Sequence, residues 1–518
     1  MSTGILLRRA PRGSTALRGG RVRRLTPYQV FGLLFWLLMT LAYWRVPPCC
    51  EAGLHAAAVA RLRAGLPDPG VSPYVAAQGA LARLTGLSGW QLLRVCGPLN
   101  LLVLLTGLGR LVRVLTPRPW APVLALAFLS VLWGTRPAWG GGSLALLPLT
   151  GSLGYPSAFA LGLTFWAWAL TGSRALDLRR VRYVGPSGLR SLSGYAALGL
   201  LYGAVALVDP GTGAGAAAGA VAFVAGWQRG WRGAVWVRWA LLCAVAAAAL
   251  AFGTHPRVLS PYGSHAVYGS YGSYTSYDGS AGLAGLAGQC WLALLGLPAL
   301  WLRGRRAAGR GGTAGRGSVA ARAGAAARGA SGHVGWRDPL VLLFALECLL
   351  LAYGLPPAVL GLVLLAPQCA LAVELAAQRP WSGRRRALGW AAAGGVCLGF
   401  LAAQAGAVVP RSVDPVGFVQ PPRWPSYDWA ARHIKPGEPV RTDAYYAVRL
   451  LPGYGIELAD GHDHRPGVRW LLLTRRERLP AEAVVVDWSR RTGEVLARLT
   501  RTGDTPPARA AAGAPVTR

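Results

Sequence analysis

Charged side chains are scarce in this sequence of 518 residues. They make up 14% of the chain, whereas hydrophobic residues make up 53%. Soluble proteins carry about 25% charged residues, so this composition is not that of an ordinary soluble domain. Lysine occurs once, as Lys435, and the chain has 20 acidic residues against 54 basic ones.

The sequence also lacks a disulfide pattern and a cleavable signal peptide. Most of its eight cysteines lie inside apolar runs, where they behave as small hydrophobic residues. Cys96 lies where it is able to pair with Cys49 or Cys50 on an oxidising side of a membrane, and three apolar thiols are an equal alternative. No small-residue cleavage site follows the first apolar segment, so we expect this segment to remain as an anchor.

Long apolar runs are abundant instead. They recur with lengths of about 17–25 residues, each enough to cross a hydrocarbon core of roughly 30 Å. We predict an all-α polytopic membrane protein with about eleven transmembrane helices over residues 28–409. The formal charge of +34 would suggest nucleic acid as a partner in a soluble domain. Here the arginines fall between apolar runs, so they indicate which loops face the cytoplasm. No nucleic acid is expected as a partner.

The arginine distribution predicts the orientation in the cell membrane. Residues 1–27 form a basic tail, which the positive-inside rule places in the cytoplasm. Residues 47–91 then form an outer loop after the first span, and the Gly/Ala/Arg-rich residues 303–337 form a disordered cytoplasmic linker. An odd number of spans places the C-terminus on the extracytoplasmic side.

Residues 410–504 differ in character from the rest and predict a small extracytoplasmic α/β domain. Strand-like runs cover 439–442, 469–474 and 483–486, and helical patterns alternate with them. We expect the last of these helices to cover 490–499. The Pro/Ala-rich residues 505–518 are expected to be a disordered tail.

The outer loop 47–91 contains the first acidic residue of the chain, Glu51. Residues 52–66 read as a short amphipathic helix that can lie in the membrane interface. His55 lies one turn beyond Glu51 on the same face, so the two side chains can share a metal or a hydrogen-bond network. The alternatives are an interfacial carboxylate that caps a helix and an interfacial histidine without a specific role.

The chain resembles the GT-C superfamily of membrane glycosyltransferases, most closely its actinobacterial members. The resemblance rests on an acidic residue just after the first span, the adjacent amphipathic helix, many spans and a C-terminal outer domain. Four short stretches carry it, namely Glu51-Ala-Gly-Leu-His55, Ser152-Leu-Gly-Tyr155-Pro-Ser157, Asp209-Pro-Gly-Thr-Gly213 and Tyr427-Asp-Trp-Ala-Ala431.

This resemblance implies transfer of a sugar from a polyprenyl-phosphate donor to a glycan, lipid or protein acceptor of the cell envelope. By position, Glu51 matches the catalytic acid/base of the family, which takes the proton of the acceptor hydroxyl. Asp209 is the candidate second acid. His55, Arg136, Arg257 and Tyr155 are candidate substrate-binding residues. Arg136 and Arg257 are the only basic residues of their loops and can meet a phosphate.

The sequence also departs from the family pattern. Cys50 precedes Glu51 where many members have a second acid, and the loop of residues 136–155 contains no acidic residue. No cofactor and no metal site are assigned, and a divalent metal at the phosphate stays an open alternative. So do a non-catalytic or degenerate protein that binds an envelope partner, and a transporter.

One acidic residue, Glu347, falls inside an apolar run beside Cys348. Acidic residues within a membrane usually face the protein interior and find a partner there. A structural hydrogen bond is the first interpretation of Glu347, and a functional role is the second.

Overall fold

The computed structural model describes fifteen stretches of the chain, and everything below concerns them. They are residues 25–45, 52–65, 71–135, 144–180, 188–228, 231, 233–253, 290–313, 338–353, 360–377, 382–409, 425–435, 437–459, 469–474 and 477–499. Three of the candidate site residues, Glu51, Arg136 and Arg257, lie outside the described residues, as do the tails 1–24 and 500–518.

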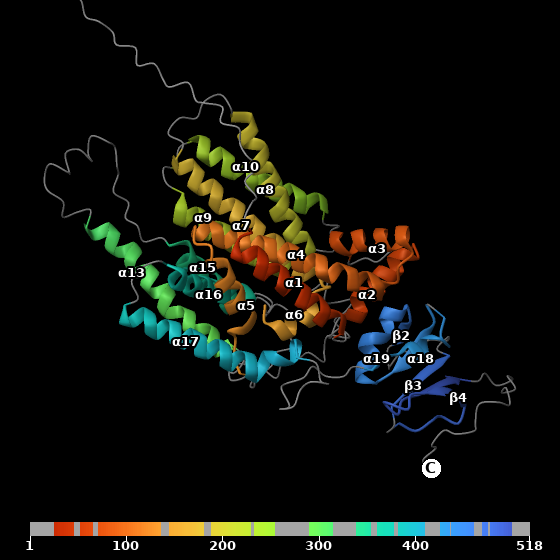
Figure 1. Ribbon diagram of the computed structural model, residues 1–518. Helices are drawn as coiled ribbons and strands as arrows, with labels where there is room; N and C mark the ends of the chain where they lie inside the picture. The colour runs from red at the N-terminus through yellow and green to blue at the C-terminus, as the bar shows by residue number, and fades with distance from the viewer. Residues whose placement is uncertain are drawn as a thin grey trace, which may run out of the picture.

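A bundle of helices makes up most of the molecule (Figure 1). In chain order its helices are α1 (Pro27–Arg45), α2 (Ala52–Arg63), α3 (Pro73–Thr85), α4 (Gly89–Leu115), α5 (Ala121–Val131), α6 (Leu146–Ser152), α7 (Pro156–Arg180), α8 (Gly188–Val208), α9 (Pro210–Trp227), α10 (Gly233–Gly253), η2 (Trp291–Gly296), α13 (Leu297–Thr313), α15 (Pro339–Ala352), α16 (Leu360–Ala376), α17 (Gly383–Gly399), η4 (Phe400–Gln404) and η5 (Ala405–Ala407). The prediction that the chain is mostly helical is therefore confirmed.

Four helices in the described part of the chain are long and apolar enough to cross a membrane. They cover Pro27–Arg45, Gly89–Leu115, Val235–Gly253 and Gly383–Ala407. Four further apolar helices are shorter, including α5 and α15. The prediction of about eleven spans therefore stays a prediction, because half of the apolar helices are shorter than the roughly 20 residues that a straight span needs.

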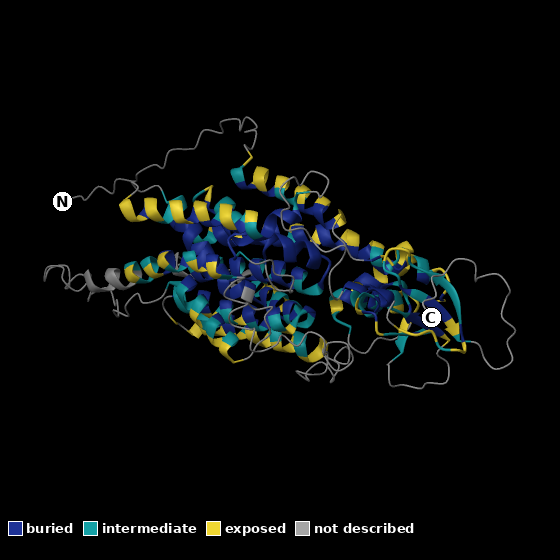
Figure 2. Cartoon of the chain, turned by 90° about the horizontal axis from the view of Figure 1, so that it is seen from below, coloured by how far each residue is buried: buried dark blue, intermediate teal, exposed yellow. Residues whose placement is uncertain are grey.

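The bundle is buried along its centre and exposed along the outward faces of its outer helices (Figure 2). Helix α4 packs on α7, α9 packs on both α7 and α15, and α16 packs on α5. The outward face of α1 is apolar although it is exposed, with Leu33, Leu34 and Leu37 about half accessible. In a protein of this composition such a face is matched by lipid.

Helix α13 extends to Thr313, so the first part of the predicted linker 303–337 is helical. The residues after Thr313 lie outside the described part of the chain until Asp338. Alanine and arginine both favour helix, and this helix begins inside the preceding apolar run, which explains why the boundary lies later than expected.

The C-terminal part is a small α/β domain with one five-stranded sheet. Its elements are α18 (Asp428–Ala431), β1 (Pro439–Thr442), α19 (Tyr445–Leu450), η7 (Leu451–Tyr454), β2 (Glu457–Ala459), β3 (Trp470–Leu473), β4 (Ala483–Trp488) and β5 (Val495–Leu499). The strand order is β2-β1-β3-β5-β4, with β1, β2 and β3 parallel and the β3–β5 and β5–β4 pairs antiparallel. The predicted alternation of helices and strands is present.

The predicted helix over 490–499 is wrong, because Val495–Leu499 is strand β5. Its Leu-Ala-Arg-Leu sequence has high helix propensity, but the segment lies between β3 and β4 and pairs with both. Leu496 and Ala497 are fully buried there. Pairing with two strands overrides the local preference.

The sheet domain docks on helix α2, the short helix that follows the first span. Helices α19 and η7 both contact α2, and η7 also contacts the start of α4 (Figure 1). The rings of Trp90 and Tyr454 lie 6.0 Å apart across this junction. We call the end of the bundle formed by α2, α3 and α6 the sheet end.

Candidate functional site

The structure describes three of the six candidate site residues: His55, Tyr155 and Asp209. Glu51 directly precedes the first residue of α2 in the sequence, and His55 lies in the first turn of that helix. The structure brings His55 and Tyr155 together, since their ring centroids are 4.8 Å apart. Their contact joins the start of α2 to the junction between α6 and α7.

Burial is the main influence on the imidazole of His55. It lowers the pKa of His55 from 6.5 to about 4, because protein atoms displace the water that would stabilise the charged ring. The histidine is therefore neutral at physiological pH, and a neutral imidazole can both donate and accept a hydrogen bond. The residue keeps part of its surface exposed, so a ligand is able to reach it.

A chain of neutral hydrogen bonds holds the segment around Tyr155. The Tyr74 hydroxyl donates to Oδ1 of Asn100 at 2.9 Å. The Asn100 Nδ2 in turn donates to the carbonyl oxygens of Leu153 at 2.8 Å and Tyr155 at 3.5 Å. Helix α3 and helix α4 thereby fix the turn that carries Tyr155.

A second contact fixes α6, which lies just before this turn. The side chain of Gln404, at the end of the π-helical turn η4, accepts a hydrogen bond from the backbone nitrogen of Leu147 at 2.9 Å. Single π-helical turns are rare and occur frequently at functional sites. The sequence reasoning missed Gln404, Asn100 and Tyr74. For Asn100 a signal existed, because it is a polar residue inside an apolar run, about residues 92–109, which is predicted to be the second span.

Asp209 caps the start of α9. Its carboxylate accepts hydrogen bonds from the backbone nitrogen of Thr212 at 3.3 Å and from the Thr212 hydroxyl. An acid in this position satisfies a free backbone N–H and is favoured by the helix dipole. Asp209-Pro-Gly is therefore a helix start, and one carboxylate oxygen is committed to the cap.

Within the described residues, no three His, Cys, Asp or Glu side chains gather closely enough to hold a metal ion. The geometry around His55 and Tyr155 offers aromatic faces and neutral hydrogen-bonding groups, which suit contacts with the hydroxyl groups and ring faces of a sugar.

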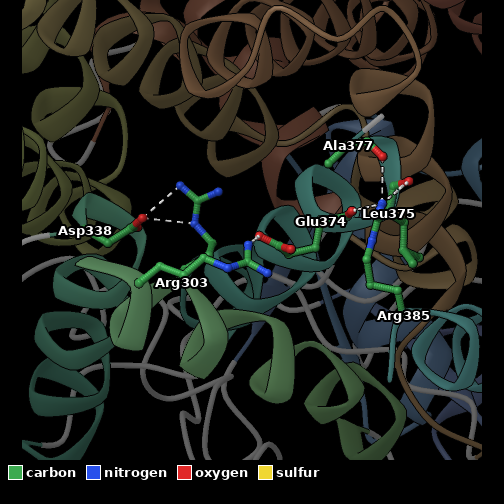
Figure 3. Close-up of polar contacts among 7 residues, drawn as sticks. Arg303, Asp338, Glu374, Leu375, Ala377 and Arg385 are labelled. Atoms are coloured by element: carbon green, nitrogen blue, oxygen red, sulfur yellow. Dashed lines mark hydrogen bonds and ion pairs between the residues drawn. The ribbon is translucent and has the colours of Figure 1, made fainter. Parts of the chain in front are cut away.

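The opposite end of the bundle holds charged contacts (Figure 3). Arg303 of α13 pairs with Asp338 at 2.8 Å, and Arg306 pairs with Glu374 of α16 at 2.6 Å. Arg385 of α17 donates to the carbonyl oxygens of Glu374 and Ala377, at 2.7 Å each. We call this the arginine end of the bundle. Its groups are paired with one another, which is typical of a structural contact.

Comparison with known proteins shows the fold. The structure is similar to the crystal structure of ArnT from Cupriavidus metallidurans bound to undecaprenyl phosphate, with a TM-score of 0.51 and 14% sequence identity. The similarity covers 93% of this chain and 98% of that one. No family model matches the sequence, and no curated protein does.

Two other glycosyltransferases are similar at lower scores. One is the oligosaccharyltransferase AglB from Archaeoglobus fulgidus in complex with an inhibitory peptide and a dolichol-phosphate, with a TM-score of 0.46 and 12% identity over 86% of this chain and 69% of that one. The other is the arabinofuranosyltransferase AftD from Mycobacteria, with a TM-score of 0.45 and 13% identity over 92% of this chain and 41% of that one. Both scores are below 0.5, so the fold assignment rests on ArnT. The predicted resemblance is confirmed: this chain has a fold like that of the GT-C membrane glycosyltransferases.

Proposed function

We propose that this protein is a membrane glycosyltransferase that moves a sugar from a polyprenyl-phosphate donor to an acceptor of the cell envelope. The observation that carries the proposal is the similarity to ArnT along nearly the whole of both chains, since that protein was crystallised with undecaprenyl phosphate. A fold shared at 14% identity can serve different activities, so the function is argued from the residues of the sheet end.

In this proposal Glu51 is the catalytic base. It precedes α2, and His55 lies one turn on in that helix, in contact with Tyr155. A carboxylate there takes the proton of the acceptor hydroxyl as the new glycosidic bond forms. Asp209, which caps α9, is the second acid of the proposal.

His55 and Tyr155 bind the sugar in this proposal, through an aromatic face and a neutral hydrogen-bonding ring. Arg136 and Arg257 bind the phosphate of the donor and stabilise its charge as it leaves. A divalent metal at the phosphate is an alternative to the arginines. The reaction takes place at the extracytoplasmic face, where the arginine pattern of the sequence places the loop 47–91 and the sheet domain.

The test uses the full-length protein in lipid with radiolabelled undecaprenyl-phosphate-linked pentoses and hexoses, together with an envelope extract as acceptor. We expect Glu51→Gln to abolish transfer, because the amide has no basic oxygen for the proton. Glu457→Gln is the matched control. Glu457 is an exposed acid of the sheet domain, paired with Arg61 only at 3.5 Å, and its variant should retain activity.

Transfer by Glu51→Gln at the wild-type rate would exclude Glu51 as the base. Equal loss in both variants would indicate that the sheet domain, and not the base, has been disturbed. Thermal unfolding of the wild type, Glu51→Gln and Glu457→Gln separates these outcomes. Loss of transfer identifies Glu51 as the base only if the Glu51→Gln protein is still folded.

A further inference from the structure

Glu347 is a fully buried acid in the apolar helix α15. Both of its carboxylate oxygens are buried without a hydrogen-bond partner in the described part of the protein. Buried polar groups in folded proteins are almost always hydrogen-bonded, so each exception calls for a physical explanation. The proposed transfer reaction does not use this residue.

The neighbouring helix α9 leaves room for the carboxyl group at Gly215. A Cβ atom at that position would lie 3.3 Å from each carboxylate oxygen of Glu347 and 2.4 Å from Cδ1 of Leu362. Any side chain larger than hydrogen would therefore occupy the space that the carboxyl group and Leu362 now fill. The α9–α15 contact depends on Glu347 lying directly against the α9 backbone.

No cation neutralises this carboxyl group among the described residues. Helix α13 contributes Arg303 and Arg306, which pair with Asp338 and Glu374, and Arg305, whose guanidinium lies over the ring of Trp301. Helix α9 contributes Asp209 at its cap, while α16 contributes Cys369 and Glu374. Helix α15 itself adds Cys348. None of these groups forms an ion pair or a hydrogen bond with Glu347.

An ionised carboxylate cannot be accommodated in such a place without a partner, since water is excluded and no charge compensates it. The neutral acid can be, at the smaller cost of one unsatisfied O–H. We propose that Glu347 is a proton-binding site in the apolar core of the bundle, and that its bound proton allows α15 to pack on α9.

Infrared spectroscopy of the full-length protein in lipid tests the protonation state directly. We expect the wild type at neutral pH to show a carbonyl band of a protonated carboxylic acid, which Glu347→Gln lacks. Glu374→Gln should keep the band, because the Glu374 carboxyl group, unlike that of Glu347, has a cationic partner in Arg306. Glu347→Asp should shift the band and not remove it. Identical spectra of the wild type and Glu347→Gln in the carboxylic acid region would overturn the proposal.

Thermal unfolding at two pH values tests the role of the proton in packing. Glutamine has nearly the shape of the neutral acid, but an unfolded glutamate loses its proton at about pH 4.3, whereas the folded protein keeps it. The wild type therefore loses stability as the pH rises above this value, so Glu347→Gln should be at least as stable as the wild type at pH 6, and its advantage should be larger at pH 9. A variant that unfolds well below the wild type at pH 6 would show that the charged form is the one needed. Neither measurement depends on transferase activity.

Discussion

The two ends of the helical bundle are held together by different kinds of contact. At the arginine end, charged groups of different helices pair with each other, as in the Arg306–Glu374 contact of 2.6 Å (Figure 3). At the sheet end the described contacts are mostly between neutral groups, such as those of Asn100 and Gln404 with backbone atoms. Helix α17 links the two ends, since Arg385 lies in its first turn and Gln404 follows its last.

The two kinds of contact indicate different roles for the two ends of the bundle. Arg385 donates to the last carbonyl groups of α16, which have no partner within that helix, so it acts as a C-terminal cap. The described contacts of the arginine end thus hold its helices together. At the sheet end the neutral groups position His55 and Tyr155 without supplying a charge of their own. In the proposed function these neutral groups bind the sugar, while Arg136 and Arg257 bind the phosphate of the donor.

The junction with the sheet domain is the part of the sheet end that is most sensitive to added volume. A Cβ atom at Gly53 would lie 1.8 Å from the carbonyl oxygen of Arg449 and 3.1 Å from Cα of Leu450. Because both are backbone atoms, no side chain can move aside. We expect Gly53→Ala to destabilise the protein by about 3 kcal/mol, in the upper part of the range for overpacking. Thermal unfolding in detergent and limited proteolysis of the sheet domain measure the effect.

Gly394→Ala is the matched control, because a Cβ atom there would meet no atom within 4 Å. It lies in helix α17, where alanine is favoured over glycine, so we expect unchanged or slightly higher stability. If Gly53→Ala unfolds at the same temperature as Gly394→Ala, the sheet domain does not dock on α2 as described.

A smaller effect is expected at the arginine end. Glu374→Gln removes the ion pair with Arg306 and leaves the backbone bond to Arg385 in place. The Glu374 side chain is 8% exposed and that of Arg306 is 38% exposed, so the arginine can still turn to water. We therefore expect a loss of about 1–2 kcal/mol, between the values for exposed and buried pairs. Thermal unfolding of the purified protein measures this loss.

The corresponding change at the sheet end is Glu457→Gln, which removes a looser pair with Arg61. Its two side chains are 53% and 44% exposed, so no measurable loss is expected. Equal effects of Glu374→Gln and Glu457→Gln would contradict the view that only the arginine end is held by charge.

Much of the fold could be predicted from the sequence because long apolar runs report helices directly. The predicted helix over 52–66 corresponds to α2, and the second predicted span, about residues 92–109, lies within α4. The number of spans was less predictable, since burial between helices allows short apolar helices such as α5, of 11 residues. Strand β5 was missed because its neighbours, and not its own residues, decide its conformation.

For the candidate site, the sequence could predict individual residues but not the contacts between them. Glu51, His55 and Asp209 stand out as rare polar groups beside apolar runs. The contact of His55 with Tyr155 joins segments far apart in the chain, and no local pattern reports such a contact. The arginine end was missed for a related reason. Arg306 was predicted to lie in a linker. Its partner Glu374 lies on another helix, and the sequence alone does not show that the two side chains meet.

A further predicted effect is a pH dependence at the sheet end, where His55 is neutral. Its pKa is about 4 in the folded protein and near 6.5 when unfolded. The unfolded chain therefore binds more protons between these values, and the contribution of His55 to stability is complete above about pH 6.5 and decreases as the pH falls toward 4. One proton changes the stability by at most about 1.4 kcal/mol per pH unit. His55→Gln is neutral at every pH, so the stability difference between wild type and variant isolates this contribution from all other titrating groups. We expect the wild type to lose stability relative to His55→Gln as the pH falls from 7 to 5. Parallel stability curves would mean that the imidazole is hydrated in the folded protein, and the contrast between a neutral sheet end and a charged arginine end would then fail at its central residue.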